Sequence, residues 1–186
     1  MTLLGITREG FRRINVNQGE TRVSDDPDVV LTTVLGSCIA ACLYDPAAKI
    51  GGINHFLLAE PGRSDIDGTS MQRYGVYAME VLINAMLTMG AARNRLRARL
   101  YGGASMLDGF HDIGSDNAQF ARRFLRDEGI ALVGEDVGGT GARRIEFRPT
   151  LGLARCRTVT DRHAVERAVP IPTAAAMAPP GDVEFF

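Results

Sequence analysis

The first half of the chain has a hydrophobic pattern that predicts β-strands. Residues 11–21 alternate polar and apolar side chains, which is typical of a strand with one face in solvent. Three later runs are continuously apolar, as the strands of a buried sheet are: residues 29–34, 38–44 and 50–59. The turn signal Asp45-Pro46 separates the last two runs, so we expect a hairpin from Cys38 to Ala59.

Two later segments carry apolar residues at helical spacing. The first helix is predicted over residues 71–89, with Gly90 as its C-terminal stop. The second is expected to begin at Ser115 or Asp116 and to end at Gly129. The predicted buried faces consist of Met79, Leu82, Ile83, Met86 and Leu87 in the first helix and Phe120, Phe124 and Leu125 in the second. Further strands are predicted at residues 95–101, 130–136, 143–149 and 153–159.

The order of these elements predicts a single strand-rich α/β domain over residues 1–163. Of the 186 residues, 45% are hydrophobic and 23% are charged, which is the composition of an ordinary soluble globular protein. The formal net charge of -1 gives no electrostatic reason to expect binding to nucleic acid or to an anionic membrane. Residues 164–186 are rich in proline and alanine and lack periodicity, so we expect a flexible or partner-dependent tail.

The cysteine content and the N-terminal residues favour a cytoplasmic protein. Three cysteines are an odd number and do not make a disulfide framework. Residues 1–20 lack the apolar core of a signal peptide, and no window approaches the roughly 18 apolar residues of a membrane span. A reducing cytoplasm is therefore expected, and free thiols persist there.

Cys38 is the first candidate for chemistry, because it follows Gly36 and Ser37 at the start of an apolar run. A glycine there permits a sharp turn that can leave a backbone N–H free as an oxyanion donor, so the thiol could be an acyl-transfer nucleophile. The alternative is a buried structural cysteine, since free cysteines are often buried. Cys42 has no polar neighbour and is expected to pack in the core, and zinc is not expected because further ligands are lacking.

His55 is the candidate partner of this thiol. It follows Asn54 inside an apolar strand, where a lone histidine is often a core residue with satisfied hydrogen bonds. The predicted hairpin, however, brings His55 beside the strand of Cys38, as a Cys–His pair requires. His111 and His163 lie in polar segments and are expected to be ordinary surface residues.

Spacing leaves open which residue would orient the imidazole. Asp45 and Asp65 carry suitable carboxylates, but each lies in a predicted turn or loop. Thr32 and Thr33 lie on the strand that leads to Cys38, and a hydroxyl or a backbone carbonyl there could accept a hydrogen bond from the ring.

Six motifs between Val29 and Val159 resemble, in the same order, the CheD family of chemoreceptor glutamine deamidases of bacterial chemotaxis. They are "LGSCIAACLYDP", "GGINHFLLAEP", "RYGVYAMEVLIN", "YGGASML", "IGSDNAQF" and "EDVGGTGARRIEF". The family usually has Met-Leu-Pro after the "NHF" element, where this chain has "LLAEP", so the rim at Ala59 and Glu60 is expected to differ.

The resemblance implies an α/β sandwich similar to the deamidase domain of cytotoxic necrotizing factor toxins. It also implies hydrolysis of glutamine side chains to glutamate on the cytoplasmic helices of methyl-accepting chemotaxis receptors, without a metal or an organic cofactor. The family's nucleophilic cysteine falls on Cys38 and its histidine on His55. Its threonine, six residues before the cysteine, falls on Thr32 and not on Thr33.

We further predict that Gly36, Ser37 and Asn54 line the oxyanion or substrate site, with the backbone N–H of Cys38 as the main oxyanion donor. Two alternatives remain open. One is another Cys–His acyl transferase, with a transglutaminase-like or amidohydrolase activity on a small amide. The other is a non-catalytic or dual-role adaptor that binds receptors or the CheC phosphatase. The resemblance to CheD implies CheC as a possible partner.

Overall fold

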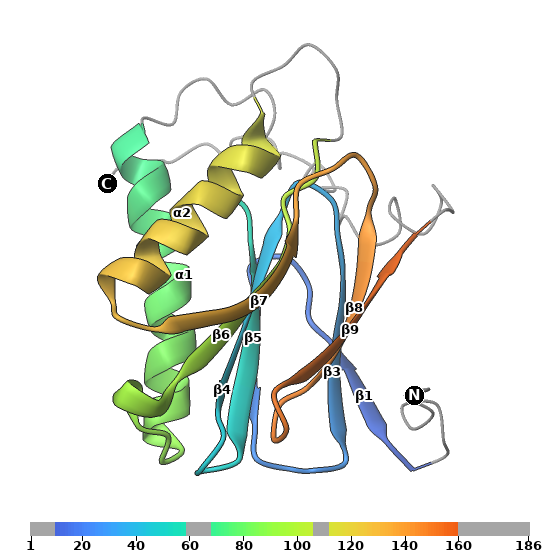
Figure 1. Ribbon diagram of the computed structural model, residues 1–186, viewed down its shortest axis with the longest axis vertical. Helices are drawn as coiled ribbons and strands as arrows, with labels where there is room; N and C mark the ends of the chain where they lie inside the picture. The colour runs from blue at the N-terminus through green and yellow to red at the C-terminus, as the bar shows by residue number, and fades with distance from the viewer. Residues whose placement is uncertain (1–9, 59–67, 106–111, 160–186) are drawn as a thin grey trace, which may run out of the picture.

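The computed structural model describes residues 10–58, 68–105 and 112–159, and these form two sheets and two α-helices in three layers (Figure 1). The five-stranded sheet contains β2 (Thr21–Ser24), β5 (Ile50–Phe56), β4 (Ile39–Asp45), β6 (Arg97–Gly102) and β7 (Ala131–Val137), in that order. The four-stranded sheet contains β1 (Arg12–Asn15), β3 (Val29–Leu35), β8 (Arg143–Arg148) and β9 (Leu153–Thr158), in that order. The predicted α/β sandwich is confirmed.

Both helices cover one face of the five-stranded sheet, and the four-stranded sheet covers the other face (Figure 1). Helix α1 (Gly68–Thr88) packs mainly on β5 and β2, and helix α2 (Ile113–Asp127) packs on β7, β4 and β6. A short 3₁₀ turn, η1 (Arg93–Arg95), precedes β6. In this arrangement β4 and β5 are enclosed on both faces, so every residue of both strands is buried. Because both faces are enclosed, the sequences of these strands are continuously apolar and do not alternate between apolar and polar residues.

The predicted helices and the hairpin are confirmed. The apolar face of α1 is buried against the sheet, as is the stripe of α2 that includes Phe120, Phe124 and Leu125. Strands β4 and β5 pair antiparallel around the turn at Asp45, as the Asp-Pro signal predicts. The start of α2 was predicted wrongly: its N-cap is Asp112, whose side chain accepts a hydrogen bond from the backbone N–H of Ser115.

The predicted strand at residues 11–21 is in fact two strands in different sheets. Strand β1 pairs parallel with β3, whereas β2 pairs antiparallel with β5. Residues 16–20 cross from one sheet to the other, and Gly19 in this crossing has φ of +82°. Alternation along a sequence does not reveal such a change of partner, because the pattern is the same whichever sheet a strand joins.

Several predictions concern residues outside the described ranges: the tail at 164–186, the rim at Ala59 and Glu60, and the side chains of Asp65, His111 and His163. Among the described helices, none is long and apolar enough to cross a bilayer.

Candidate active site

Cys38 and His55 lie on the same face of the five-stranded sheet, the face that is turned toward the four-stranded sheet. His55 is the direct cross-strand partner of Ala40, and Cys38 precedes Ala40 by two residues. Ala40 belongs to the core between the sheets, and Cys38 packs against the same core. Thiol and imidazole are therefore diagonal neighbours across the β4–β5 pair, a placement in which long side chains can interact.

The turn at residues 36–38, which joins β3 in one sheet to β4 in the other, is fixed by hydrogen bonds to its carbonyl groups. The backbone N–H groups of Gly103 and Ala104 donate to the carbonyls of Cys38 and Gly36, at 2.8 and 2.9 Å. The side-chain amide of Asn117 donates to the carbonyl of Ser37 at 2.9 Å. Cys38 therefore sits on a turn whose backbone is held at all three residues.

This turn requires the glycine pair of the "YGGASML" motif. Gly102 has φ of +106°, and a Cβ added to it would lie 2.1 Å from the carbonyl oxygen of Cys38. Only glycine permits so close an approach of two backbones.

Asn117 was not found by sequence reasoning. It is fully buried near the start of α2, and its Oδ1 accepts a hydrogen bond from the N–H of Leu58, which follows β5. Asn117 thus links the turn of Cys38 to the end of the strand that carries His55. A buried amide on the apolar side of an amphipathic helix was the signal for such a role.

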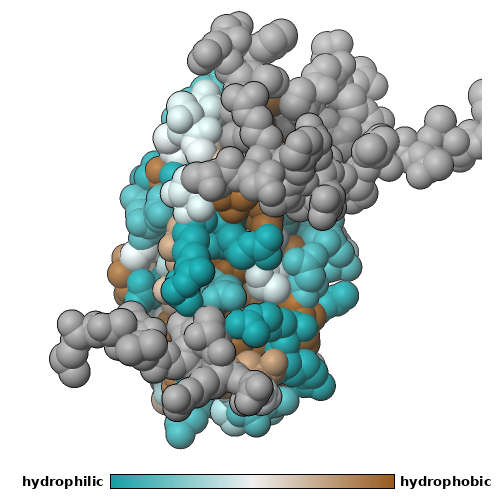
Figure 2. Space-filling view, turned by 90° about the vertical axis from the view of Figure 1, so that its right-hand side faces the viewer, coloured by the Kyte–Doolittle hydropathy of each residue, from teal (hydrophilic) through white to brown (hydrophobic). Residues whose placement is uncertain are grey.

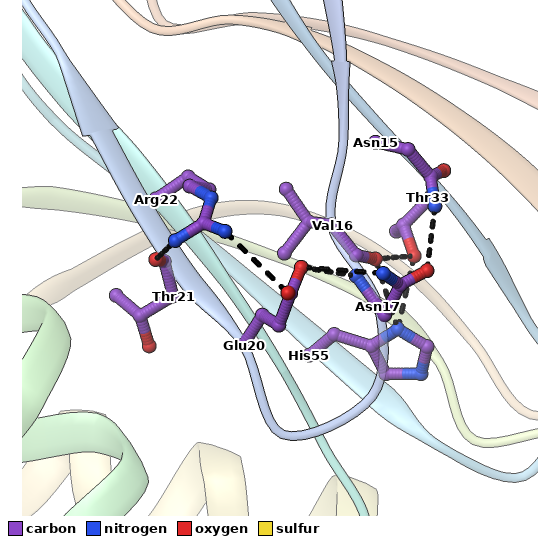
Figure 3. A network of polar contacts seen from close by, with 8 residues as sticks. All are labelled: Asn15, Val16, Asn17, Glu20, Thr21, Arg22, Thr33 and His55. Carbon is purple, nitrogen blue, oxygen red and sulfur yellow. Dashed lines mark hydrogen bonds and ion pairs between the residues drawn. The ribbon is translucent and has the colours of Figure 1, made fainter. Parts of the chain in front are cut away.

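The imidazole of His55 is oriented by Thr33 and by the carbonyl of Val16 (Figure 3). The Thr33 hydroxyl donates its one hydrogen to the Val16 carbonyl at 2.7 Å, so it can only accept from His55 Nδ1–H, at 2.9 Å. The Val16 carbonyl also lies 3.4 Å from Nδ1. These contacts favour the tautomer with hydrogen on Nδ1, which leaves the lone pair of Nε2 available as a base. Nε2 is buried and has no hydrogen-bond partner among the described residues.

Burial keeps both groups neutral in the resting site. It raises the pKa of the Cys38 thiol to about 12, against the opposing effect of the residue's own backbone N–H. Burial also lowers the pKa of His55 to about 4, although the Val16 carbonyl and the nearby charge of Glu20 favour the protonated ring. The resting pair is therefore a thiol and a neutral imidazole, whose Nε2 lone pair is free at neutral pH.

The structure corrects the prediction for Thr32, because this residue does not reach His55. Thr32 pairs directly with Glu146 on β8, so both side chains lie on the same face of the four-stranded sheet. The Glu146 side chain forms ion pairs with Arg13 and Arg155, on the outer face. Figure 2 views the molecule from the right-hand side of Figure 1 and shows mostly hydrophilic side chains there. Thr32 points outward because neighbouring strand residues point to opposite faces, and Thr33 points inward.

Asn54 faces α1 and not the space between the sheets, and it lines the cavity beside His55, so its part in an oxyanion or substrate site stays a prediction. Its Oδ1 accepts from the backbone N–H of Ala41, and its Nδ2 donates to the carbonyl of Ala78 and to the sulfur of Met79. With the side chain buried and its hydrogen bonds made inside the protein, Asn54 anchors the helix to the sheet.

Other candidates from the sequence lie away from the thiol. Asp45 is at the opposite end of β4 and binds Arg95, so it does not orient His55. Cys42 is fully buried in the core between the sheets, and burial raises the pKa of its thiol strongly, as expected for a packing residue. Gly36 and Ser37 lie in the turn itself and contribute their carbonyls to its fixation. The described residues include no cluster of three or more side chains suited to hold a metal ion.

A cavity of about 340 Å³ lies beside His55, between β2, β5 and α1. Its lining includes Glu20, Arg22, Tyr74 and Tyr77, but not Cys38. It is therefore adjacent to the pair and does not surround the thiol.

The fold and site define a two-sheet α/β protein in which a thiol is held near an oriented, neutral imidazole, as in enzymes that use Cys–His chemistry. Comparison with known proteins makes this more specific. The family model for CheD chemotactic sensory transduction matches residues 57–158. The chain is 65% identical to the probable chemoreceptor glutamine deamidase CheD of Zymomonas mobilis, over 100% of this chain and 98% of that protein. The chain belongs to the CheD family.

A second relative, the protein of the same name from Caulobacter sp. strain K31, is 53% identical over 94% of this chain and 93% of its own length. The Zymomonas relative aligns over 100% of this chain, so it also covers Cys38 and His55, which precede the residues that the family model matches. Among solved structures, Neisseria meningitidis protein NMB0706 is similar at a TM-score of 0.45 and 14% identity, over 70% of this chain and 63% of that chain.

Proposed function

We propose that this protein is a protein-glutamine deamidase that converts glutamine side chains of chemoreceptors to glutamate, with Cys38 as the nucleophile and His55 as the base. The observation that carries the proposal is the free Nε2 of an imidazole fixed by Thr33, on the same sheet face as the thiol. The names of relatives up to 65% identical supply the substrate class. The protein would then act in the cytoplasm, on receptor helices, and association with the CheC phosphatase stays a prediction.

The reaction begins with transfer of the Cys38 Sγ–H proton to His55 Nε2 as sulfur attacks the carboxamide carbon of the substrate. A C–S bond forms, and the carbonyl π electrons move to oxygen. We expect the backbone N–H of Cys38, which lies close to its own sulfur, to donate to this oxyanion. The His55 imidazolium then gives its proton to the departing nitrogen, and ammonia leaves a thioester.

Hydrolysis of the thioester reverses these roles. His55 Nε2 takes a proton from water, and the hydroxide adds to the thioester carbon. The C–S bond then breaks as His55 returns its proton to the sulfur, which restores the Cys38 thiol and the neutral imidazole and releases glutamate. The net reaction consumes one water and releases one ammonia. Throughout the reaction, His55 Nδ1–H keeps its hydrogen bond to the Thr33 hydroxyl. Thr33 is therefore a positioning residue.

The direct test is incubation of the protein with a glutamine-bearing cytoplasmic helical fragment of a chemoreceptor, followed by peptide mass spectrometry. Conversion of glutamine to glutamate supports the proposal. Incorporation of an added primary amine in place of water would instead identify a transglutaminase-like acyl transferase. No change of any glutamine by the folded protein, with receptor fragments that it binds, would favour the adaptor alternative.

The two adjacent threonines provide a matched pair of variants. Thr33→Val keeps the shape of the side chain but removes the hydroxyl that accepts from His55 Nδ1, so kcat is expected to fall about 10- to 100-fold. Thr32→Val changes a side chain on the outer face of the sheet and is expected to leave kcat within about twofold of wild type. Deamidation rates of the two folded variants check this, and the opposite order would restore the role that family resemblance gave to Thr32.

The acid side of the pH profile tests the state of His55. Because burial lowers the pKa of His55 to about 4, the ring stays neutral down to that pH, and kcat/KM is expected to reach half its maximum near pH 4. An ordinary histidine would give this midpoint near its usual value of 6.5. Circular dichroism at each pH separates loss of the base from unfolding. A midpoint near 6.5 in folded protein would show that His55 is solvated or is not the base.

A further inference from the structure

The side chain of Gln18 contacts the thiol of Cys38. Neither the sequence predictions nor the Cys–His chemistry described above gives Gln18 a role. The Cys38 Sγ–H donates to Gln18 Oε1 at 3.4 Å. Both residues are only partly buried, so the contact lies where the site opens toward solvent. Gln18 thus presents to the nucleophile the same chemical group, a primary carboxamide, that the proposed reaction attacks.

The position of Gln18 is fixed by the crossing loop, residues 16–20, on both sides. Two residues before Gln18, the Val16 carbonyl accepts a hydrogen bond from the Thr33 hydroxyl and also lies near Nδ1 of His55. After Gln18, the Gly19 N–H donates to the His55 carbonyl at 2.7 Å, and the His55 N–H donates to the Glu20 carbonyl at 3.1 Å. The loop that orients the base therefore also holds Gln18 against the nucleophile.

Hydrogen bonds within the crossing loop also join its residues Asn17 and Glu20 (Figure 3). The N–H of Asn17 donates to the Glu20 carboxylate at 3.0 Å, and the N–H of Glu20 donates to the Asn17 carbonyl at 3.0 Å. These bonds fix the backbone on both sides of Gln18, so its side chain starts from a defined position beside the thiol.

A carboxamide suits this position because it has both an acceptor and two donors and carries no charge. In the resting site its Oε1 accepts from the thiol, as the structure has it. When the proton has passed to His55 and negative charge moves from sulfur to the substrate oxygen, an acceptor there would be repulsive. Rotation of the amide about its last bond replaces Oε1 by Nε2–H and supplies a donor instead.

We propose that Gln18 is a catalytic residue, whose carboxamide holds the thiol before reaction and donates Nε2–H to the oxyanion as Cys38 attacks. The inference rests on the proposed function, because it needs Cys38 as the nucleophile. Gln18 adds a second donor to the Cys38 N–H, so two donors face the developing charge.

Substitution at position 18 tests this role in the full-length protein with a receptor-helix substrate. Gln18→Ala is expected to lower kcat about 100-fold with little change of KM, because one oxyanion donor is lost. Gln18→Glu has the same size but offers no donor and adds a negative charge, so it is expected to lower kcat at least as much. Gln119→Ala, which removes an exposed carboxamide on α2 that donates to Ser115 and makes no described contact with the thiol, is the matched control and is expected to keep wild-type kcat.

Alkylation of Cys38 by iodoacetamide, followed by peptide mass spectrometry, gives a readout that does not depend on deamidation. The carboxylate of Gln18→Glu would raise the pKa of the thiol by about one unit, so alkylation at a given pH should slow about tenfold. Wild-type kcat in Gln18→Ala, or a lower KM with unchanged kcat, would overturn the proposal, since Gln18 would then be a bystander or a plug. Finding Glu at position 18 of the wild-type protein would also overturn it, because Gln18 would then be a substrate.

The Cys38→Ala variant separates this inference from the function on which it rests. Full activity of Cys38→Ala would end both proposals. An inactive Cys38→Ala beside a fully active Gln18→Ala would end only the role of Gln18.

Discussion

Replacing Cys38 with alanine is expected to abolish glutamine deamidation, with a loss of at least about 10⁴-fold in kcat, and to leave the fold intact. The reaction has no other route to a thioester, because the sulfur that forms it is gone. The Cys38 side chain is partly exposed, at the edge of the core between the sheets, so its truncation leaves no large cavity. Mass spectrometry of receptor peptides after long incubation measures any remaining conversion.

Cys42→Ala is the matched control for this loss. Cys42 is on the same strand and is fully buried, but its side chain packs in the core and reaches no group of the site. We expect this variant to keep kcat and to lose about 1 kcal/mol of stability. Equal inactivation of both variants in folded protein would contradict the assignment of Cys38 as the nucleophile.

Asp45→Asn is expected to cause the largest loss of stability, about 2 to 4 kcal/mol in the free energy of unfolding. Asp45 is fully buried at the hairpin turn, where its carboxylate accepts from the backbone N–H groups of Ala47, Ala48 and Ala92. It also forms an ion pair with Arg95 at 2.8 Å. An asparagine presents an NH₂ group to donors at one of these oxygens, so part of this network is broken. Chemical denaturation measures the loss, and the melting temperature should fall by about 10 °C.

The pH dependence of this loss identifies its cause. Burial by itself would raise the pKa of Asp45, but the hydrogen bonds from Arg95 and from the three backbone N–H groups outweigh burial and hold the pKa well below its ordinary value of 3.8. A depressed folded-state pKa gives stability that is present above about pH 4 and is lost as the pH falls further. The difference between wild type and Asp45→Asn should therefore shrink in acid.

Asp127→Asn supplies the exposed counterpart. Asp127 contacts Arg126 at 3.3 Å, but both side chains are largely in solvent, so the change should alter stability by no more than about 0.5 kcal/mol. A loss of similar size in the two variants would show that burial of Asp45 does not matter.

The sequence was a good guide wherever neighbouring residues along the chain also interact in the fold. Helical spacing identified the buried faces of α1 and α2, because residues three and four apart share a face whatever the helix packs on. The Asp-Pro turn predicted the β4–β5 hairpin, and the hairpin placed Cys38 and His55 on adjacent strands. The nucleophile and the base could therefore be proposed before the structure was known.

The sequence failed where the answer depends on which face of a strand meets the other sheet. Thr32 and Thr33 are adjacent and identical in chemistry, and a shift of one residue reverses the face. Resemblance to the family counted six residues back from Cys38 and arrived at Thr32, whereas packing of β3 turns Thr33 toward His55. The neighbours Asn54 and His55 likewise lie on opposite faces of β5, and Asn54 contacts helix α1.

By itself, then, the sequence determined the helices, the central hairpin and the pairing of one thiol with one imidazole, because these follow from local periodicity and from a short turn. Only the tertiary structure decided how the site is completed. Thr33 contacts the imidazole of His55, Gln18 contacts the thiol of Cys38 from 20 residues away, and Asn117 fixes the turn that carries Cys38 from 80 residues away along the chain. Such contacts arise when two sheets and a helix close on one another, and no local pattern of the chain encodes which side chains then meet.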